Sequence, residues 1–544
     1  MRGMHGRVFR DKSPELVFLK RNEKFKDEKV CCEDDRFAIQ FDGVLLDRKR
    51  PQSARERFTL LEELFAEQGE KTAAQLRGAF NLAVFDKERR RVYLSNDLLG
   101  KRALYYCAFE DELLYAESYY DLLALLADEG RETELDCDAI RAMVEEGELT
   151  GDLCYLREIR YLDAYESLMI ELEPWKIEVV RNEPERPCTA DTLDDALEAF
   201  DRLFSAAVER QFAKNAEYGY RQFVTLSGGM DSRACLLQGI RSGYSRDIVC
   251  FNYSQSGSVD QRVAQQIAAD FSLDYLYYPM DAAVFLTRLS QSMDRNECQQ
   301  SGFGATGACT MATLLNTAEA GILHTGLCGG ELMGDMIELE EGGLRGKLKE
   351  IARRFGFKGR GALCTHERSY LDNLRACHNS SSMFIASCEV ASPFLDEDVV
   401  AFVTRLDPDW LFWRAFYRKW MLRYLPNDYT TTFFYGPIGI SPARELAKKG
   451  FAYLGKALTG VNRREMNPVD YWMQKHDALR EQCEKEYADG CAELRSRGVG
   501  EEVLSILEKG WTPDWYQRFN VLTAIRAIRD LENNRVRFCA VVPE

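Results

Sequence analysis

The residues best suited to chemistry occupy positions 227–232, which read Ser-Gly-Gly-Met-Asp-Ser and follow the apolar segment 223–226. Two adjacent glycines let the backbone approach an anion closely, and the first N–H groups of a following helix attract negative charge. Ser227 and Ser232 add hydroxyl donors. The pattern predicts a loop that binds the phosphates of a nucleotide or pyrophosphate. The alternative is a glycine turn with ordinary helix-capping residues.

Asp231 lies inside this loop. A carboxylate beside phosphate groups is unfavourable unless a cation lies between the charges. Mg²⁺ binds one or two carboxylates together with phosphate oxygens. Asp231 therefore predicts a magnesium ion that accompanies the nucleotide.

Strands and amphipathic helices must position this loop. After the polar stretch 181–192, which contains Pro184 and Pro187, we expect an amphipathic helix over 193–212. Strand and helix patterns then alternate, which predicts a parallel sheet covered by helices. Beyond about residue 396 the chain is expected to be mostly helical. The apolar strands are predicted over 222–226, 247–253 and 322–326.

The chain before residue 181 has a different pattern, with short runs rich in β-branched and aromatic residues. It predicts a layered, mostly β domain. The fold class is therefore α/β in two domains: a β-sandwich-type domain over 1–185, and a parallel-sheet domain with a helical C-terminal extension over 190–544. The N-terminal strands are predicted over 15–19, 36–41, 79–85, 91–95 and 103–109.

Composition excludes several classes of function. The 544 residues carry a formal net charge of −17, which argues against broad binding to nucleic acid or to an anionic membrane. No apolar run approaches the ~18 residues of a membrane span, and no secretory signal is recognised, so we expect a cytoplasmic protein. The 17 cysteines form no CxxC pair and are expected to be reduced.

Three groups of motifs carry a family resemblance. The 227–232 run resembles the pyrophosphate loop of ATP pyrophosphatases. Residues 76–106, which end in a D-x-x-G-K pattern at Asp97 and Lys101, resemble a glutaminase-type domain. The run 389–396 is similar to a third motif of the asparagine synthetase superfamily. The chain is identified as a member of that superfamily over about residues 35–445.

The resemblance implies ATP and Mg²⁺ as cofactors. The strand that contains Phe251 would pack beside the adenine, and Asp260 opens a helix, as a functional residue or as a plain N-terminal acid. The implied catalytic residues are Asp231, Glu331 and Lys419, and the implied metal ligands are Asp231 and Asp335. The implied cofactor-binding residues are Leu226, Ser227, Gly228, Gly229, Asp231, Ser232, Phe251 and Gly326.

The glutaminase half departs from the family. Its nucleophile is an N-terminal cysteine whose own α-amino group acts as the base. This chain begins Met1-Arg2-Gly3, and Cys31 and Cys32 have no free amine. We therefore expect no glutaminase activity, as in members that resemble β-lactam synthetases and lasso-peptide cyclases.

The synthetase half departs too. Leu327 occupies a catalytic position of the family and Gly330 the position of its second metal-binding aspartate; Glu331 or Asp335 would have to supply that carboxylate. Thr432 and Phe434 replace an arginine and a lysine that stabilise negative charge.

A preceding helix offers other cations, which either reach the site or form a solvated or acid-paired helix face. They are Arg414, Arg418, Lys419 and Arg423. The glycine-rich run 301–307 is expected to form a mobile loop.

Three functions remain open. The first is a glutamine-independent ligase that adenylates a carboxylate of a small molecule or peptide, releases AMP and pyrophosphate, and forms an amide. The second is a pseudoenzyme that serves as an ATP-binding scaffold or partner protein. The third uses the same loop with another acceptor, for which a reactive Cys328 would be the sign. A homodimer or a biosynthetic partner protein is compatible with each.

Overall fold

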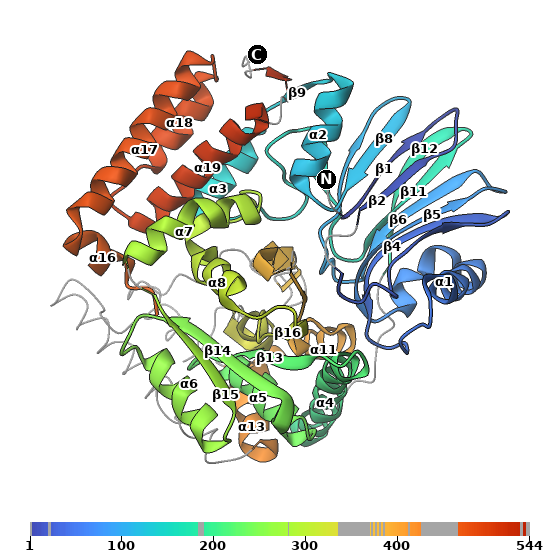
Figure 1. Cartoon of the computed structure of the whole chain (residues 1–544). Helices are drawn as coiled ribbons and strands as arrows, with labels where there is room; N and C mark the ends of the chain where they lie inside the picture. The colour runs from blue at the N-terminus through green and yellow to red at the C-terminus, as the bar shows by residue number, and fades with distance from the viewer. Residues whose placement is uncertain are drawn as a thin grey trace.

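The structure is a computed structural model in which two regions of different architecture pack together (Figure 1). The structure describes residues 3–19, 23–182, 190–280, 282–335, 370–371, 374–375, 378–379, 382–384, 387–411, 414–425, 466–533 and 537–539. Thr432 and Phe434, the two positions at which the sequence departs from the family's arginine and lysine, lie outside these ranges.

The N-terminal region consists of two antiparallel sheets that share a core of inward-facing side chains from β1, β8, β5, β6 and β11. The first sheet has the order β10-β7-β8-β1-β2. Its strands are β1 (Gly3–Phe9), β2 (Glu15–Leu19), β7 (Tyr105–Ala108), β8 (Glu112–Ala116) and β10 (Ile159–Tyr161). The second has the order β12-β11-β6-β5-β4-β3. Its strands are β3 (Val30–Glu33), β4 (Phe37–Leu45), β5 (Gly78–Asp86), β6 (Arg91–Asn96), β11 (Glu166–Leu172) and β12 (Trp175–Arg181).

A helix covers the outer face of the six-stranded sheet. α1 (Ala54–Gln68) begins after Ser53, whose hydroxyl caps it, and buries Phe58, Leu61 and Phe65 against that face. These three residues follow the three-to-four spacing that gives a helix one apolar side. The five strands predicted before residue 110 are confirmed as β2, β4, β5, β6 and β7.

The second region is built on a parallel sheet of order β15-β14-β13-β16-β17 (Figure 1). Since β13 lies between β14 and β16, the loops after these three strands meet at one edge. The predicted strands are confirmed as β13, β14 and β16. The strands are β13 (Arg221–Thr225), β14 (Ile248–Ser254), β15 (Asp274–Pro279), β16 (Ala320–His324) and β17 (Glu389–Ala391).

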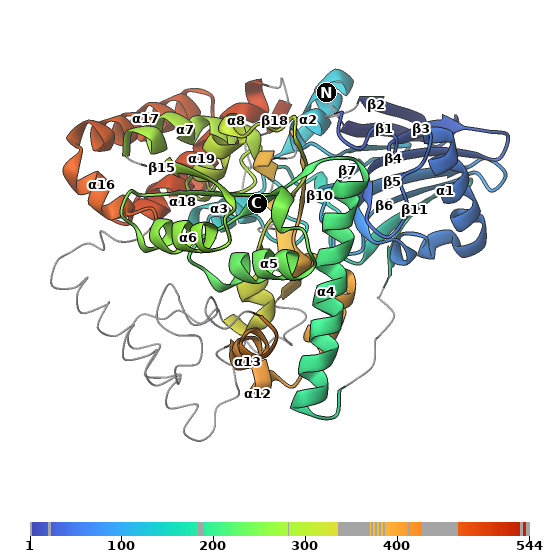
Figure 2. The same cartoon turned by 60° about the horizontal axis from the view of Figure 1, so that its bottom comes forward.

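Helices cover this sheet, and the first of them runs along the N-terminal region (Figure 2). It is α4 (Leu193–Glu217), which confirms and extends the helix predicted over 193–212. The others that precede β16 are α5 (Met230–Arg241), α6 (Val259–Asp270), α7 (Ala282–Arg295) and α8 (Gly302–Leu314).

The glycine-rich run 301–307 is not a loop, so that prediction is wrong: it begins helix α8. Its glycines serve close packing instead. A Cβ on Gly302 would lie 2.8 Å from Met293, and a Cβ on Gly307 would lie 2.3 Å from the Tyr253 ring. Such contacts exclude a side chain and let α8 pack tightly against α7 and β14.

The C-terminal helices lie against the N-terminal helix α3 (Cys137–Glu146) and share one core with it (Figure 1). A Cβ on Gly510 would lie 2.3 Å from Val144, so this contact is close. The described residues beyond 396 are mostly helical, as predicted. Their helices are α11 (Glu397–Val403), α12 (Pro408–Leu411), α13 (Ala415–Tyr424), α16 (Val469–Lys475), α17 (Asp477–Ser496), α18 (Glu501–Gly510) and α19 (Trp515–Asn533).

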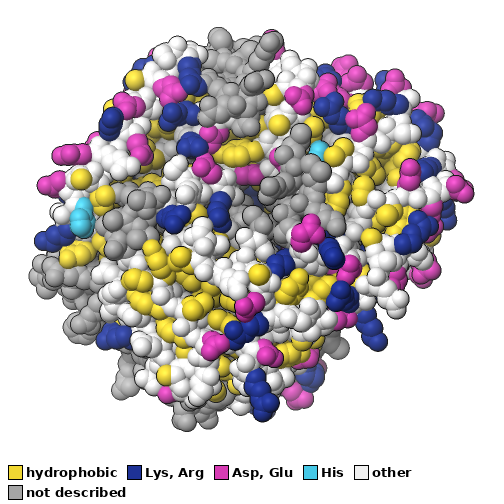
Figure 3. Space-filling model, viewed as in Figure 1, with side chains coloured by type: hydrophobic (Ala, Val, Ile, Leu, Met, Phe, Trp, Pro, Cys, Tyr) yellow, Lys and Arg dark blue, Asp and Glu magenta, His cyan; other side chains and the backbone are white. Residues whose placement is uncertain are grey.

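The predicted fold class is confirmed: antiparallel sheets occupy the N-terminal region, a parallel sheet occupies the second, and helices are added to it. None of the helices within the described residues combines the length and apolar character that a bilayer crossing requires. Acidic and basic side chains are interspersed over the face shown in Figure 3.

Buried ion pairs join the two regions. Lys101 Nζ lies 2.6 Å from Glu397 Oε1, and Arg102 Nη1 lies 3.2 Å from Glu389 Oε2. These side chains are at most 12% exposed. Breaking a buried pair from one side leaves an uncompensated charge, so such contacts fix the relative placement of the two regions.

Replacing Lys101 by Met tests this interface. We expect the free energy of unfolding to fall by about 3–5 kcal/mol, because Glu397 then stays buried without its cation. The measurement is urea unfolding followed by far-UV circular dichroism. Arg423→Met is the control, since its pair with Asp194 is exposed (47% and 83%) and contributes at most about 1 kcal/mol. Equal losses in both variants would contradict the prediction.

Candidate active site

The predicted phosphate loop, residues 227–232, connects β13 to the start of α5 and is held by its own hydroxyl groups. The Ser227 N–H donates to Ser232 Oγ at 3.1 Å, and the Gly229 N–H donates to Ser227 Oγ at 3.1 Å. Gly229 is the N-cap of α5 and provides no capping side chain. The first N–H groups of α5 are therefore directed at the loop, where an anion can accept from them.

Asp260, in the first turn of α6, supports the loop from behind. Its Oδ1 accepts a hydrogen bond from the Gly228 N–H at 3.1 Å. The residue is 4% exposed, and burial raises the pKa of its carboxyl group. Of the two alternatives for Asp260, the geometry favours a functional one, since the carboxylate sets the orientation of a phosphate-loop peptide.

A second loop, residues 325–330, follows β16 and touches the first. A Cβ on Gly326 would lie 2.5 Å from the carbonyl carbon of Asp231 and from the Ser232 nitrogen. A Cβ on Gly329 would lie 2.7 Å from Asp231 Cβ. Glycine at these two positions is therefore what allows the second loop to reach the start of α5.

Asp335 fills the space that a side chain on Gly330 would take. A Cβ on Gly330 would lie 2.7 Å from Asp335 Oδ2. Asp335 is the last residue of the short helical turn η4 (Glu331–Asp335). The backbone of this turn departs from helical geometry at Gly334, whose φ of +117° favours glycine. The Asp335 carboxylate therefore lies beside position 330, where the resemblance places a metal-binding aspartate.

Arg414 links Asp335 to the phosphate loop. Its Nε and Nη2 both donate to the Asp335 carboxylate, and its Nη1 lies 3.8 Å from Asp231 Oδ1. Tyr417, one helical turn further along α13, also interacts with Asp231. Two carboxylates and one guanidinium therefore meet at the beginning of α5.

Burial raises the pKa of Asp231 to about 6. The Arg414 guanidinium lowers this pKa in part, whereas the Asp335 and Glu331 carboxylates raise it further. Desolvation thus outweighs the ion pair, as it does for many groups that function in clefts.

Oxygen donors of this kind fit Mg²⁺. Asp231 Oδ1 is buried, and the Asp335 carboxylate lies in the cradle left open by Gly330. Among the described residues, no group of three or more His, Cys, Asp or Glu side chains forms a closed metal site. Mg²⁺ would therefore take its remaining ligands from phosphate and water, which is its usual preference.

The other implied residues lie in different surroundings. Leu226 and Phe251 are 1% exposed and joined by a backbone hydrogen bond of 2.9 Å, so their side chains belong to the core. Glu331 begins η4 and interacts with Asp231. Lys419 is exposed, two residues from Tyr417 and so on the opposite side of α13; the structure does not bring it to the site.

The cation that does reach the site is Arg414, one of four basic residues that the sequence offered. Arg423 pairs instead with the exposed Asp194. Sequence reasoning missed Tyr417 and Gly334. The three-residue spacing of Arg414 and Tyr417, which places both on one helical face, was the available signal.

Cys328 is not a free thiol. It is 3% exposed and takes part in a disulfide. The expectation of reduced cysteines is therefore wrong at this position. Twelve other cysteines within the described residues are free thiols. A disulfide sulfur is no nucleophile, which removes the sign that favoured a sulfur-based reaction.

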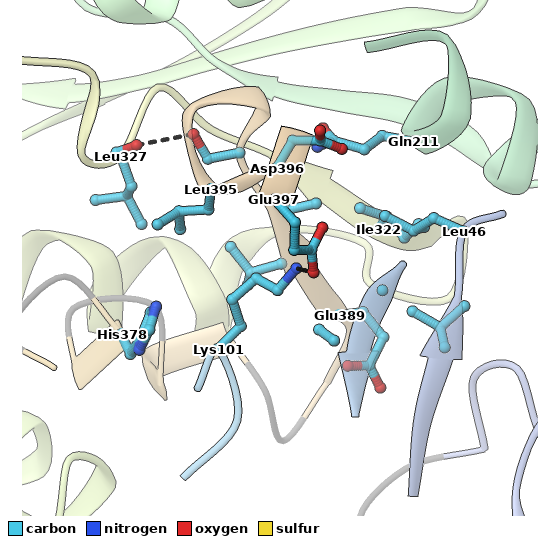
Figure 4. Close-up of a pocket in the computed structure, with 16 residues that line it drawn as sticks. Leu46, Lys101, Gln211, Ile322, Leu327, His378, Glu389, Leu395, Asp396 and Glu397 are labelled. Carbon is cyan, nitrogen blue, oxygen red and sulfur yellow. Dashed lines mark hydrogen bonds and ion pairs between the residues drawn. The ribbon is translucent and has the colours of Figure 1, made fainter. Parts of the chain in front are cut away.

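A small pocket lies between the two regions (Figure 4). Lys101 and Glu397 pair across it, and Leu327 lines it. The Leu327 carbonyl accepts from Ser392 Oγ at 2.8 Å. The residue at the family's catalytic position therefore packs toward the domain interface, where it supplies apolar surface.

A second buried cluster marks the predicted glutaminase half. Lys29 Nζ and Arg102 Nη2 lie 3.4 and 3.7 Å from Asp42 Oδ1, and all three side chains are at most 4% exposed. Asp42 belongs to the Asp42-Gly43-Val44 run. Its carboxylate serves a structural ion cluster.

Comparisons with known proteins agree with this order of domains. A glutamine amidotransferase domain family matches residues 50–178, and the family of the queuosine biosynthesis protein QueC matches residues 221–306. These matches confirm an amidotransferase-like region followed by an ATP pyrophosphatase-type region, and the second implies use of ATP. No curated protein matches the chain.

Two solved structures are similar at low identity. One is described as the allosteric regulatory enzyme of purine biosynthesis, at 8% identity over 51% of this chain and 74% of that chain, with a TM-score of 0.21. The other is glutamine phosphoribosylpyrophosphate amidotransferase from B. subtilis complexed with ADP and GMP, at 10% identity over 68% and 87%, with a TM-score of 0.20. At these TM-scores neither bears on the function.

The raised pKa predicts how nucleotide binding depends on pH. Asp231 must lose its proton before it binds a metal, so the affinity for Mg²⁺-ATP should fall about tenfold for each pH unit below about 6. For the free protein the sign is opposite: a raised carboxyl pKa stabilises the fold most at low pH, and this contribution declines as pH rises through 6. Calorimetric titration from pH 5 to 8 measures the affinity.

Asp231→Asn is the control for this titration, because it retains the titration of the nucleotide itself and lacks that of the carboxyl group. The variant should bind more weakly at high pH and lose part of the pH dependence. Identical pH profiles for the two proteins would contradict the assignment.

The two loop glycines should respond differently to substitution. In Gly326→Ala the new Cβ meets backbone atoms of Asp231 and Ser232, so we expect a loss of about 1–3 kcal/mol in stability together with loss of ATP binding. In Gly330→Ala it meets only the ends of the Asp335 and Arg414 side chains, which can shift at smaller cost. Thermal melts with and without Mg²⁺-ATP separate the two effects, and equal melts of both variants would count against close contact of the loops.

Proposed function

Because the domain matches and the motifs fit the asparagine synthetase superfamily, we propose that this chain is an ATP-dependent, amide-forming ligase that does not use glutamine. Its substrates are a carboxylate of a small molecule or peptide and an amine. The observation that carries the proposal is the cluster of Asp231, Asp335 and Arg414 at the end of the phosphate loop.

In the proposed reaction a carboxylate oxygen of the substrate attacks the α-phosphorus of ATP, and the bond to the β-phosphate bridging oxygen breaks. Pyrophosphate leaves, and an acyl-adenylate remains. The amine then attacks the acyl carbon, AMP leaves with the carboxylate oxygen, and the amine nitrogen loses a proton. Both steps depend on positioning and on relief of negative charge.

Particular residues can meet these two requirements, positioning of the substrates and relief of negative charge. The first N–H groups of α5 are available to the β and γ phosphates. The Gly228 and Gly229 N–H groups shape the loop instead, since they donate to Asp260 and Ser227. Asp231 and Asp335 would hold Mg²⁺, which neutralises phosphate charge when bound. Arg414 supplies a positive charge in the same cluster. It is the described group best placed to do what the family lysine, replaced by Phe434, does elsewhere.

Independence from glutamine rests on the interior of the N-terminal region. Asp42 is engaged by Lys29 and Arg102 in a buried cluster. Cys31 and Cys32 lie within strand β3, where neither has a free α-amino group. The region then acts as a support for the ATP-binding region through the buried pairs described above.

One observation favours a second function, that of an ATP-binding scaffold without ligase activity. Leu327, at a catalytic position of the family, lines the interdomain cavity and offers no polar side chain. Such a protein would bind Mg²⁺-ATP through the same loop and turn over no substrate.

Hydroxylamine distinguishes the two functions, because it captures acyl-adenylates from many carboxylates as hydroxamates and so replaces an unknown amine. The protein is incubated with Mg²⁺-ATP, hydroxylamine and pools of amino-acid-derived or peptide carboxylates, and pyrophosphate release is measured. We expect release that requires a carboxylate and that added glutamine does not increase. Binding of ATP without release from any pool would favour the scaffold.

Asp231→Asn should lower this pyrophosphate release at least 100-fold, since it removes a charged ligand of the phosphate-bound metal. Asp194→Asn, at an exposed position, is the matched control and should retain activity. Full activity of Asp231→Asn would refute the proposed role of the loop.

A further inference from the structure

Arg414 occupies the position between the two carboxylates assigned to Mg²⁺. Its Nε and Nη2 donate to Asp335, and its Nη1 faces Asp231 Oδ1 at 3.8 Å. All three guanidinium nitrogens are therefore directed at these two acids. The guanidinium compensates the negative charge of both carboxylates.

The backbone at Arg414 shows that this placement is costly. Its φ of +56° and ψ of +29° lie in the left-handed region, which is uncommon for a residue other than glycine, asparagine or aspartate. Arg414 is also the N-cap of α13, where the helix dipole disfavours a positive charge. Conformations of this kind persist where surrounding contacts fix them, and they occur at functional sites.

The neighbouring glycine is adapted to the same contact. A Cβ on Gly330 would lie 2.6 Å from Arg414 Nη2 and 2.7 Å from Asp335 Oδ2. The absence of a side chain at 330 thus makes room for both partners of the ion pair. Gly330, Asp335 and Arg414 therefore lie in close mutual contact.

We propose that Arg414 is a resident cation that competes with divalent metal for Asp231 and Asp335 until a nucleotide is present. This inference rests on the proposed function, in which these carboxylates hold Mg²⁺. The Asp335 oxygens accept from the guanidinium, which also places positive charge 3.8 Å from Asp231 Oδ1. A metal that binds both carboxylates must therefore displace Arg414 from Asp335. If metal displaces Arg414 while no nucleotide is bound, the partly buried guanidinium is left without a compensating negative charge.

Nucleotide changes the balance. Phosphate oxygens carry negative charge to which the planar guanidinium binds well, and they provide ligands for the metal. Arg414 therefore couples the two binding events: metal and nucleotide should each bind more tightly in the presence of the other, and by the same factor. In addition, the Arg414 guanidinium becomes free to contact the phosphates only when both metal and nucleotide have bound.

Mn²⁺, whose free ion is measured by electron paramagnetic resonance, tests the proposal without ATP and without turnover. We expect wild-type protein to bind Mn²⁺ weakly and Arg414→Gln to bind it at least tenfold more tightly, because the two carboxylates lose their competitor. Arg423→Gln, which breaks an exposed pair on the same helix, should bind as wild type does. The double variant Arg414→Gln with Asp231→Asn should lose the gain, which places the ion at this cluster.

Adding a non-hydrolysable ATP analogue completes the test. The analogue should increase the Mn²⁺ affinity of wild type by a larger factor than that of Arg414→Gln. If Arg414→Gln binds Mn²⁺ no more tightly than wild type, the inference is wrong. Arg414→Lys guards against misfolding of the first variant: it keeps the charge without the forked geometry and should bind Mn²⁺ between the two.

The result is separable from the proposed function. A gain in Mn²⁺ affinity in Arg414→Gln supports the competition even if no carboxylate supports pyrophosphate release. Pyrophosphate release by wild type without that gain supports the ligase and refutes the competition.

Discussion

The close contact between two glycine-bearing loops at the start of α5 is the constraint on which the site depends. Gly326 and Gly329 bring the second loop within van der Waals distance of Asp231, and no other residue type fits there. The contact exists because β13 and β16 are adjacent parallel strands whose carboxyl ends lie at the same edge of the sheet. The phosphate loop, the carboxylates and the arginine are all arranged around this contact.

The N-terminal region supports the same contact from a distance. Arg102 holds Glu389 at the start of β17, and the end of that strand holds the second loop: Thr325 N–H donates to the Ala391 carbonyl at 2.9 Å, and Ser392 Oγ donates to the Leu327 carbonyl. The N-terminal region therefore contributes to the placement of the second loop through contacts that lie outside that loop. Buried ion pairs suit this purpose because they are directional and strongly destabilising when broken.

The sequence predicts best where the chemistry and the fold are local. The strand, loop and helix around residues 227–232 are set by six adjacent residues, and the structure agrees with that prediction. The contact of Arg414 with Asp335 joins residues 79 positions apart and depends on where α13 begins. The sequence motifs pointed to Lys419 as the catalytic cation, which the structure does not bring to the site. The run 301–307 was wrongly predicted to be a loop for a related reason. Its glycines are required by close packing against neighbouring elements, and not by a turn.

In the proposed site, a carboxylate at Asp335 in place of one at position 330 depends on different parts of the fold. A carboxylate on the second loop would be fixed by the sheet, whereas Asp335 is placed by Gly334, which packs against the Leu411 carbonyl, and by Arg414 at the start of α13. The two carboxylates are therefore anchored on one side by the parallel sheet and on the other by α12 and α13. Their separation, on which the proposed metal site depends, is thus set by how these helices pack against the sheet.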